Sequence, residues 1–289
     1  MTSDIVSAAL PGNTVRPILS AAESADGVAA FSEAFERGLD DDSLNHTHLI
    51  VEESGAPVAV AGIAPDGSVE MAVHPEHRRA GHGRALVEAA RERNTDAGFW
   101  AHGDLPAAQE LAAAFGMKKV RELLVMGTVL DDDTQAPQLR DGYDLVAYPE
   151  LVDRWGRGVV DKRWLEVNND AFSWHPEQGG WDIEQLHRAM DTDWFDPEGL
   201  WFLVKGDEIA GFHWTKRHPD GTGEVYVVGL ASAHRGEGMG GPLVQAGLNY
   251  LKNAGSSQVI LYVESDNEAA VKRYRQLGFE IREQHVVYK

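Results

Sequence analysis

The chain has 289 residues, which is enough for two ordinary domains or one large one. Its 46 acidic and 26 basic residues give a formal net charge of -20, so the molecule repels phosphate backbones and anionic lipid. Neither nucleic acid nor a membrane is therefore expected as a partner. The 43% of hydrophobic residues predict a folded globular protein. Because the chain has no cysteine, disulfides, thiolate metal sites and cysteine-borne covalent intermediates are excluded.

The beginning of the chain predicts no targeting segment. Residues 1–10 have no basic start and no long apolar run. No later stretch reaches the roughly 18 to 20 apolar residues that a membrane span needs. The expected location is therefore the cytoplasm.

The first half of the chain predicts a hairpin, a strand, a loop and a helix in that order. Residues 48–51 and 57–63 are short apolar runs separated by a turn, which indicates two antiparallel strands. Residues 69–73 predict a further strand. Residues 83–93 carry alanine and leucine at helical spacing and predict a helix.

A charged run at residues 131–137, which ends in a proline, is the clearest break in the pattern. It separates two regions of regular apolar periodicity. We therefore predict two domains, residues 1–135 and residues 136–289.

The second half repeats the plan of the first. Residues 200–204 and 209–214 predict a hairpin around a Gly-Asp turn. Residues 224–231 predict the next strand. Residues 243–251 place leucine and valine on one helical face.

The two halves also share a glycine motif. Segments 73–83 and 230–240 both contain R-x-x-G-x-G between the predicted strand and the predicted helix. Farther on, Gly116 and Gly278 each follow an apolar helix and precede a last strand. The chain is therefore predicted to be an internal duplication.

A glycine loop between a strand and a helix leaves backbone N–H groups unpaired at the positive end of the helix dipole, which suits a pyrophosphate. Gly236, Gly238 and Gly241 also match the dinucleotide-binding fingerprint, with Glu264 near the distance of a ribose carboxylate. The first copy breaks that fingerprint, and hairpins precede both loops, so this alternative is disfavoured. A P-loop is excluded because neither loop continues into Lys-Ser or Lys-Thr.

These loops resemble those of the GNAT superfamily of N-acetyltransferases, in which an R/Q-x-x-G-x-G/A loop after a splayed strand holds the pyrophosphate of acetyl-coenzyme A. Segment 267–279 also resembles the later motif of that family. The resemblance implies an α/β (α+β) fold with two tandem GNAT domains. Each would be a mixed, mostly antiparallel sheet with flanking helices.

Segments 175–181, 211–216, 223–229 and 261–267 further resemble the mycothiol synthases of actinobacteria. That family transfers acetyl from acetyl-coenzyme A to the cysteinyl amine of a cysteine-glucosamine-inositol pseudodisaccharide, the last step of mycothiol biosynthesis. The resemblance implies the same activity here, with these two small molecules as partners of a monomer. Two alternatives stay open: a tandem acetyltransferase for another small amine or antibiotic, and a non-catalytic acyl-coenzyme A sensor.

The resemblance assigns contacts with acetyl-coenzyme A to both copies. In the first copy they are Met71, Ala72, Val73, Arg79, Ala80, Gly81, His82, Gly83 and Arg84. In the second copy they are Val228, Gly229, Leu230, Arg235, Gly236, Glu237, Gly238, Met239, Gly240, Gly241, Asn267, Glu268, Ala269, Ala270, Val271 and Lys272. Tyr274 and Asn267 align with Ala112 and Leu105, so the first copy lacks a side-chain proton donor and is predicted to be mainly architectural.

Acetyl transfer to an amine needs a base, because an α-amino group with a pKa of about 8 is largely protonated at neutral pH. The resemblance makes Glu224 that base and Tyr274 the acid that protonates the leaving thiolate. It also assigns an oxyanion site to the backbone N–H groups of residues 228–230. From the residues alone, an acid at the start of a strand is more often exposed and an aromatic residue on a helix is more often part of the core, so it is the resemblance that gives Glu224 and Tyr274 these roles.

The acceptor, a polyol with an ammonium group, is expected to contact carboxylates and aromatic hydroxyls. The resemblance assigns this role to Glu33, Glu177, Lys216, Glu224 and Tyr262. The twelve histidines show neither H-x-x-x-H nor H-E-x-x-H spacing, so no metal is predicted.

Overall fold

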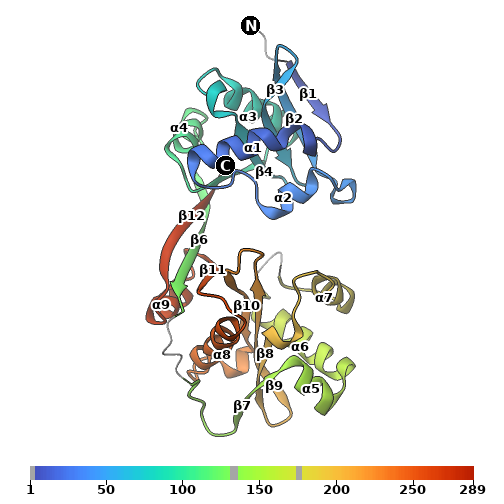
Figure 1. Cartoon of the computed structure of the whole chain (residues 1–289), viewed down its shortest axis with the longest axis vertical. Helices are drawn as coiled ribbons and strands as arrows, with labels where there is room; N and C mark the ends of the chain where they lie inside the picture. Colours follow the sequence, from blue (N-terminus) through green and yellow to red (C-terminus); the bar gives the residue numbers. More distant parts are fainter. Residues whose placement is uncertain (1–3, 131–135, 174–177) are drawn as a thin grey trace. The chain divides into compact units, whose positions relative to one another are not determined.

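A computed structural model describes residues 4–130, 136–173 and 178–289. The chain divides into two compact units (Figure 1). Unit 1 consists of the chain up to Leu124 with Glu264–Asp266 and Glu283–Lys289, and unit 2 consists of Val125–Val263 and Asn267–Arg282. Residues 131–135 of the predicted boundary lie outside the described residues. The division into residues 1–135 and 136–289 stays a prediction.

Unit 1 is a sheet with helices on both faces. Its strands are β1 (Asp4–Ala8), β2 (Thr47–Glu53), β3 (Ala56–Ile63), β4 (Ser68–Val73), β5 (Gly98–His102) and the C-terminal part of β12 (Glu280–Tyr288), in that spatial order. Its helices are α1 (Gly12–Asp26), α2 (Glu33–Gly38), α3 (His82–Arg93) and α4 (Pro106–Ala114), with 3-10 turns η1 (Asp42–Leu44) and η2 (Pro75–His77). The predicted hairpin, strand and helix of the first half correspond to β2–β3, β4 and α3, whereas α1 was not predicted.

Unit 2 has the same plan. Its strands follow the spatial order β6 (Lys119–Val129, of which the part from Val125 belongs to this unit), β11 (Gln258–Glu264), β10 (Gly223–Leu230), β9 (Glu208–Arg217), β8 (Leu200–Lys205) and β7 (Tyr143–Ala147). Its helices are α5 (Tyr148–Trp155), α6 (Arg157–Ala171), α7 (Ile183–Met190), α8 (Gly240–Asn253) and α9 (Glu268–Gln276), with 3-10 turns η3 (Pro197–Gly199) and η4 (Ser232–His234). The strands and helix predicted in the second half are present as β8, β9, β10 and α8.

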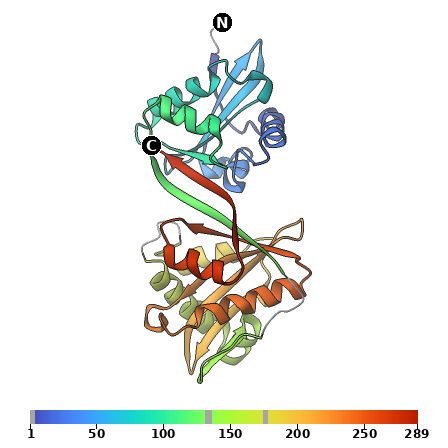
Figure 2. The ribbon, with the colours of Figure 1, turned by 90° about the vertical axis from the view of Figure 1, so that its left-hand side faces the viewer.

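Each unit takes one strand from the far end of the other repeat. β12, at the end of the second repeat, pairs antiparallel with β5, from His285↔His102 to Tyr288↔Phe99. β6, at the end of the first repeat, is the neighbour of β11. β6 and β12 are themselves adjacent, in green and red in Figure 2. The repeats therefore exchange their last strands.

The hairpin turns explain the register of the first strands. Ser54 and Gly55, which join β2 to β3, both have positive φ, as a type I′ turn requires. Gly206, with φ 60°, opens the two-residue turn between β8 and β9, as in a type II′ turn. Both turns match the right-handed twist of the strands that they connect.

Burial on both faces explains why the strands are nearly continuous apolar runs. In unit 1, Leu49 and Val51 pack with Leu86 of α3, whereas Ile50 packs with Ile18 of α1 on the opposite face. Unit 2 follows the same rule, with a cluster around Trp164 of α6 on one face and Leu243 of α8 on the other. In the part of the chain that the structure describes, no helix is both long and apolar enough to cross a membrane.

A buried histidine gives unit 2 a measurable sensitivity to acid. His213 of β9 is fully buried, with Nδ1 3.1 Å from the carbonyl oxygen of Leu243. Burial disfavours the imidazolium and lowers the pKa of His213 from 6.5 to about 4. The unfolded chain therefore takes up the proton first as the pH falls.

We expect neutral His213 to make its full contribution to the free energy of unfolding above pH 6.5. The free energy of unfolding should then fall as the pH drops toward 4. Between pH 7 and 5 the loss from this group is about 2 kcal/mol. Urea titrations followed by tryptophan fluorescence would measure it. In His213→Phe, which does not titrate, the difference between the two pH values should shrink by this amount; an unchanged difference would contradict the assignment.

Candidate active site

The parallel strands of each unit stop pairing after a few residues. β10 pairs with β11 from Gly223↔Val259 to Val225↔Leu261. On its other side, the register of β10 against β9 shifts between Val225 and Val227. β4 pairs with β5 only at Ser68↔Gly98 and Val69↔Phe99. Beyond these pairs the described strands splay, so the later part of β10 and of β4 has a backbone edge without a strand partner.

That edge presents backbone N–H groups. The N–H of Ala231 bonds to the carbonyl oxygen of Ala210 on β9. Because N–H directions alternate along a strand, the N–H groups of Val228 and Leu230 face the opposite side, where β11 has diverged. In the first copy the N–H of His74 bonds to Val58 in the equivalent way. Each splayed strand can thus offer donors to a carbonyl oxygen.

The glycines of both loops leave room for a ligand. Gly81 and Gly238 have φ of 94° and 80°, and a Cβ on either would have nothing within 4 Å. α3 begins at His82 and α8 at Gly240, so each loop runs into the positive end of a helix. Positive φ, open space and a helix N-terminus together suit a pyrophosphate.

The arginine of each motif closes the loop onto the strand. Nε of Arg78 donates to the carbonyl oxygen of Val73 at 3.2 Å, and Nε of Arg235 donates to that of Leu230 at 3.3 Å. The Arg78 guanidinium also pairs with Asp26 at 2.7 Å, and Arg235 Nη2 donates to Ala171 at 3.0 Å. Both side chains therefore brace the loop, and a contact of Arg235 with the cofactor stays a prediction.

A cavity of about 880 Å³ lies beside the first glycine loop in unit 1. Its lining includes the predicted contacts Met71, Ala72, Val73, Arg79, Gly81, His82, Gly83 and Arg84. The remaining predicted contact, Ala80, is exposed and is not part of this lining. The side chain of Arg79 is 82% exposed and pairs with Glu110 at 2.7 Å. The size and position of the cavity suit a large ligand that extends from the loop.

The second glycine loop is anchored through its glutamate. Glu237 Oε2 accepts a hydrogen bond from the Tyr143 hydroxyl at 3.0 Å and lies 3.4 Å from Lys205 Nζ. These contacts, with Tyr143 first, lower the pKa of the Glu237 carboxyl. His234 Nδ1 completes the cluster, 2.9 Å from the Tyr143 hydroxyl. The Glu237 side chain thus holds the loop to β7 and β8.

Glu224 is a buried carboxylate near the start of β10, 5% exposed. Its Oε2 lies 2.7 Å from His218 Nε2, a partner that the sequence did not reveal. Lys216 is the cross-strand neighbour of Glu224 on β9, and its ammonium lies 5.0 Å from the ring of Trp194 and 5.9 Å from that of Tyr226. The structure therefore brings Glu224 and Lys216 together.

Tyr274 lies on α9, half-buried, with its ring 5.8 Å from that of Phe279. Burial raises the pKa of Tyr274 to about 12, so the phenol remains protonated at neutral pH. Asn267 caps α9 by accepting the N–H of Ala270 at 3.2 Å. The guanidinium of Arg273 lies where a Cβ of Gly241 would be, which brings α9 against the start of α8.

The other predicted acceptor residues are more scattered. Tyr262 is on β11 and 48% exposed. Glu33 is exposed at the start of α2 in unit 1. Glu177 lies outside the described residues.

Comparison with known proteins gives the class first. The Acetyltransferase (GNAT) family model matches residues 163–279, and an Acetyltransferase (GNAT) domain model matches residues 45–116. The chain therefore contains two GNAT acetyltransferase domains, and the predicted fold class is confirmed. A GCN5-related N-acetyltransferase from Sphaerobacter thermophilus has the same fold, with a TM-score of 0.78 and 22% identity over 98% of this chain and 94% of that one.

Closer relatives give the particular family. The chain is 48% identical to a mycothiol acetyltransferase of Corynebacterium efficiens, over 94% of this chain and 90% of the relative. It is also 48% identical to one of Corynebacterium aurimucosum, over 95% and 93%. The chain belongs to the mycothiol acetyltransferase family. It is an N-acetyltransferase that depends on acetyl-coenzyme A, as was predicted.

Substituting one glycine in each loop should separate the roles of the copies. We expect Gly238→Asp to reduce turnover at least about 100-fold, because a carboxylate repels pyrophosphate at the loop. Gly81→Asp should weaken cofactor binding to unit 1 and retain most of the turnover. Gly206→Asp and Gly55→Asp, also at positive φ with open space, control for backbone strain. Turnover lost with Gly81→Asp and kept with Gly238→Asp would reverse the assignment.

Proposed function

We propose that the second copy performs the acetyl transfer and that the first binds coenzyme A without turning it over. The activity follows from the family: the chain catalyses the final step of mycothiol biosynthesis. One observation carries the division of labour. Both splayed strands carry a buried carboxylate, Glu224 on β10 and Glu70 on β4, but among the described residues only the second copy adds a tyrosine on the helix packed against the glycine-loop helix. The first copy has Ala112 where the second has Tyr274.

As acceptor we propose the cysteinyl amine of the cysteine-glucosamine-inositol pseudodisaccharide, with acetyl-coenzyme A as donor. Glu224 and Lys216 are cross-strand neighbours, and together they offer a carboxylate for an ammonium and a hydrogen-bond donor for hydroxyls, which supports an acceptor of this kind. Tyr262 and Glu177 are proposed as further contacts, and Glu33 as one from unit 1. We also propose a cytoplasmic monomer and a transfer reaction that uses no metal. Higher turnover on simple amines than on the pseudodisaccharide would favour a different acceptor, and no acetyl transfer at all would favour an acyl-coenzyme A sensor.

Glu224 acts as the general base in this proposal. Among the described residues its hydrogen bond to His218 occupies Oε2, which leaves Oε1 to take the proton of the acceptor ammonium, directly or through a water. The neutral amine then attacks the thioester carbonyl, and its nitrogen releases a second proton to water as the amide forms, while the tyrosinate left by proton donation takes one up from water. The N–H groups of Val228 and Leu230 donate hydrogen bonds that stabilise the negative charge developing on the carbonyl oxygen. Transfer is direct, without an acyl-enzyme.

Tyr274 acts as the general acid. Its phenol is protonated at neutral pH and donates its proton to the thiolate of coenzyme A as the carbon–sulfur bond breaks. Acetyl-coenzyme A supplies the activated acyl group, and the glycine loop and α8 hold its pyrophosphate. The contact of Arg273 with Gly241 keeps α9 beside the loop that fixes the donor.

The base predicts a pH signature. We expect Glu224→Gln to lower kcat/KM most at neutral pH, by roughly 10²-fold, and to recover part of the rate as the pH rises, because the amine then loses its proton without help. Rates from pH 6.5 to 9.5 would measure this. Glu208→Gln, an exposed acid on β9, should follow the parent profile. Equal slowing of Glu224→Gln at every pH would remove the base role.

The acid predicts a hydroxyl-specific loss. Tyr274→Phe should reduce turnover roughly 10²- to 10⁴-fold with little change in acetyl-coenzyme A affinity, because the ring and its packing remain. Tyr250→Phe removes a hydroxyl that donates to Asp196 from a half-buried tyrosine on α8; this matched control should keep its turnover and lose only a little stability. Normal turnover in Tyr274→Phe would exclude the phenol from the chemistry, and a loss confined to affinity would make it a binding residue.

A further inference from the structure

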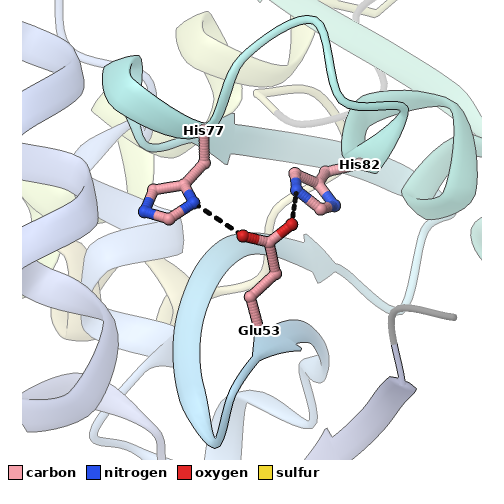
Figure 3. A group of neighbouring side chains, drawn as sticks. All are labelled: Glu53, His77 and His82. Carbon is pink, nitrogen blue, oxygen red and sulfur yellow. Dashed lines mark hydrogen bonds and ion pairs between the residues drawn. The ribbon is translucent and has the colours of Figure 1, made fainter. Parts of the chain in front are cut away.

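Two histidines of the first glycine loop converge on one carboxylate. Nδ1 of His77 lies 2.9 Å from Glu53 Oε2, and Nε2 of His82 lies 2.9 Å from Glu53 Oε1 (Figure 3). The three donor atoms lie within 4.8 Å of one another. Glu53 ends β2, His77 ends η2 and His82 begins α3, so the cluster joins the sheet to both ends of the loop.

This donor set is one that proteins use for transition metals. Two imidazole nitrogens with one carboxylate oxygen bind Zn²⁺ in sites that keep a position open for water or substrate. The geometry points to such a site here. We propose that Glu53, His77 and His82 bind one divalent transition-metal ion, Zn²⁺ foremost, which ties β2 to the first glycine loop. This departs from the expectation of no metal, which was based on spacing within the sequence.

Burial and access both suit a bound ion. His82 is 2% exposed, which holds one imidazole rigidly in place. The side chains of His77 and Glu53 are 36% and 39% exposed, which leaves a path from solvent. His77 and His82 also line the large cavity of unit 1. A cation at this place would add positive charge at the edge of the loop proposed to hold a pyrophosphate.

The second copy provides an internal comparison. Lys205 ends β8 as Glu53 ends β2, each directly before the hairpin turn. His234 aligns with His77, and Met239 with His82. The second loop thus has a permanent cation at the position of the carboxylate and a thioether at that of the buried imidazole. Glu237 pairs there with Lys205, so that loop is anchored to its strand without a metal.

Metal binding to the tag-free full chain, first stripped with a chelator, tests this proposal. Calorimetric titration with ZnCl₂ should show one ion per chain, and Co²⁺ should give the visible absorption of a bound ion. Glu53→Gln, which keeps the shape and one acceptor oxygen, should weaken Zn²⁺ binding at least about tenfold. His77→Gln should do the same and serves if Glu53→Gln does not fold. His234→Gln, the matched change in the second copy, should bind like the parent.

Thermal unfolding gives a second readout. Zn²⁺ should raise the unfolding temperature of the parent and of His234→Gln, because an ion that binds only the folded chain stabilises it. It should not raise that of Glu53→Gln. Absence of saturable Zn²⁺ binding in the parent would overturn the proposal and leave the cluster as hydrogen bonds alone. Equal binding by the parent and Glu53→Gln would overturn it as well.

Discussion

The early end of parallel pairing in each sheet is the constraint on which the rest depends. β10 and β11 share three paired positions, and β4 and β5 share two, before the strands diverge. The divergence leaves backbone N–H groups of β10 facing the gap, and the loop that follows runs into a helix N-terminus. One backbone device thus supplies a place for a carbonyl oxygen and, next to it, a place for a pyrophosphate. Because both copies have these backbone features, differences in function between the copies must come from their side chains.

Both loops keep their shape by the same contact and are anchored by different ones. Arg78 and Arg235 each bond back to the carbonyl oxygen five residues earlier, at the end of the splayed strand. The anchoring charges are then reversed. The first copy has a carboxylate on the strand and histidines on the loop, and the second has a lysine on the strand and a glutamate on the loop. The two repeats therefore share the backbone conformation of the glycine loop but differ in the side-chain contacts that anchor it.

Local patterns in the sequence predicted most of the fold. The turns at Ser54-Gly55 and Gly206-Asp207, and the repeated glycine motif, depend on residues close together in the chain, so their physics is visible locally. The exchange of β6 and β12 was not predicted, because no local pattern encodes which of two similar edges a strand pairs with. The same limit applies to the site. Glu224 was singled out by resemblance, whereas its bond to His218 and the meeting of Glu53 with His82 depend on tertiary contacts.

The central claim is that this chain catalyses acetyl transfer from acetyl-coenzyme A to an amine acceptor. The most direct test is release of the thiol of coenzyme A from acetyl-coenzyme A, measured with and without the cysteine-glucosamine-inositol pseudodisaccharide. We expect release to require the pseudodisaccharide and to yield one thiol for each amine that becomes acetylated. Release at the same rate without the acceptor, or no release with it, would contradict the account.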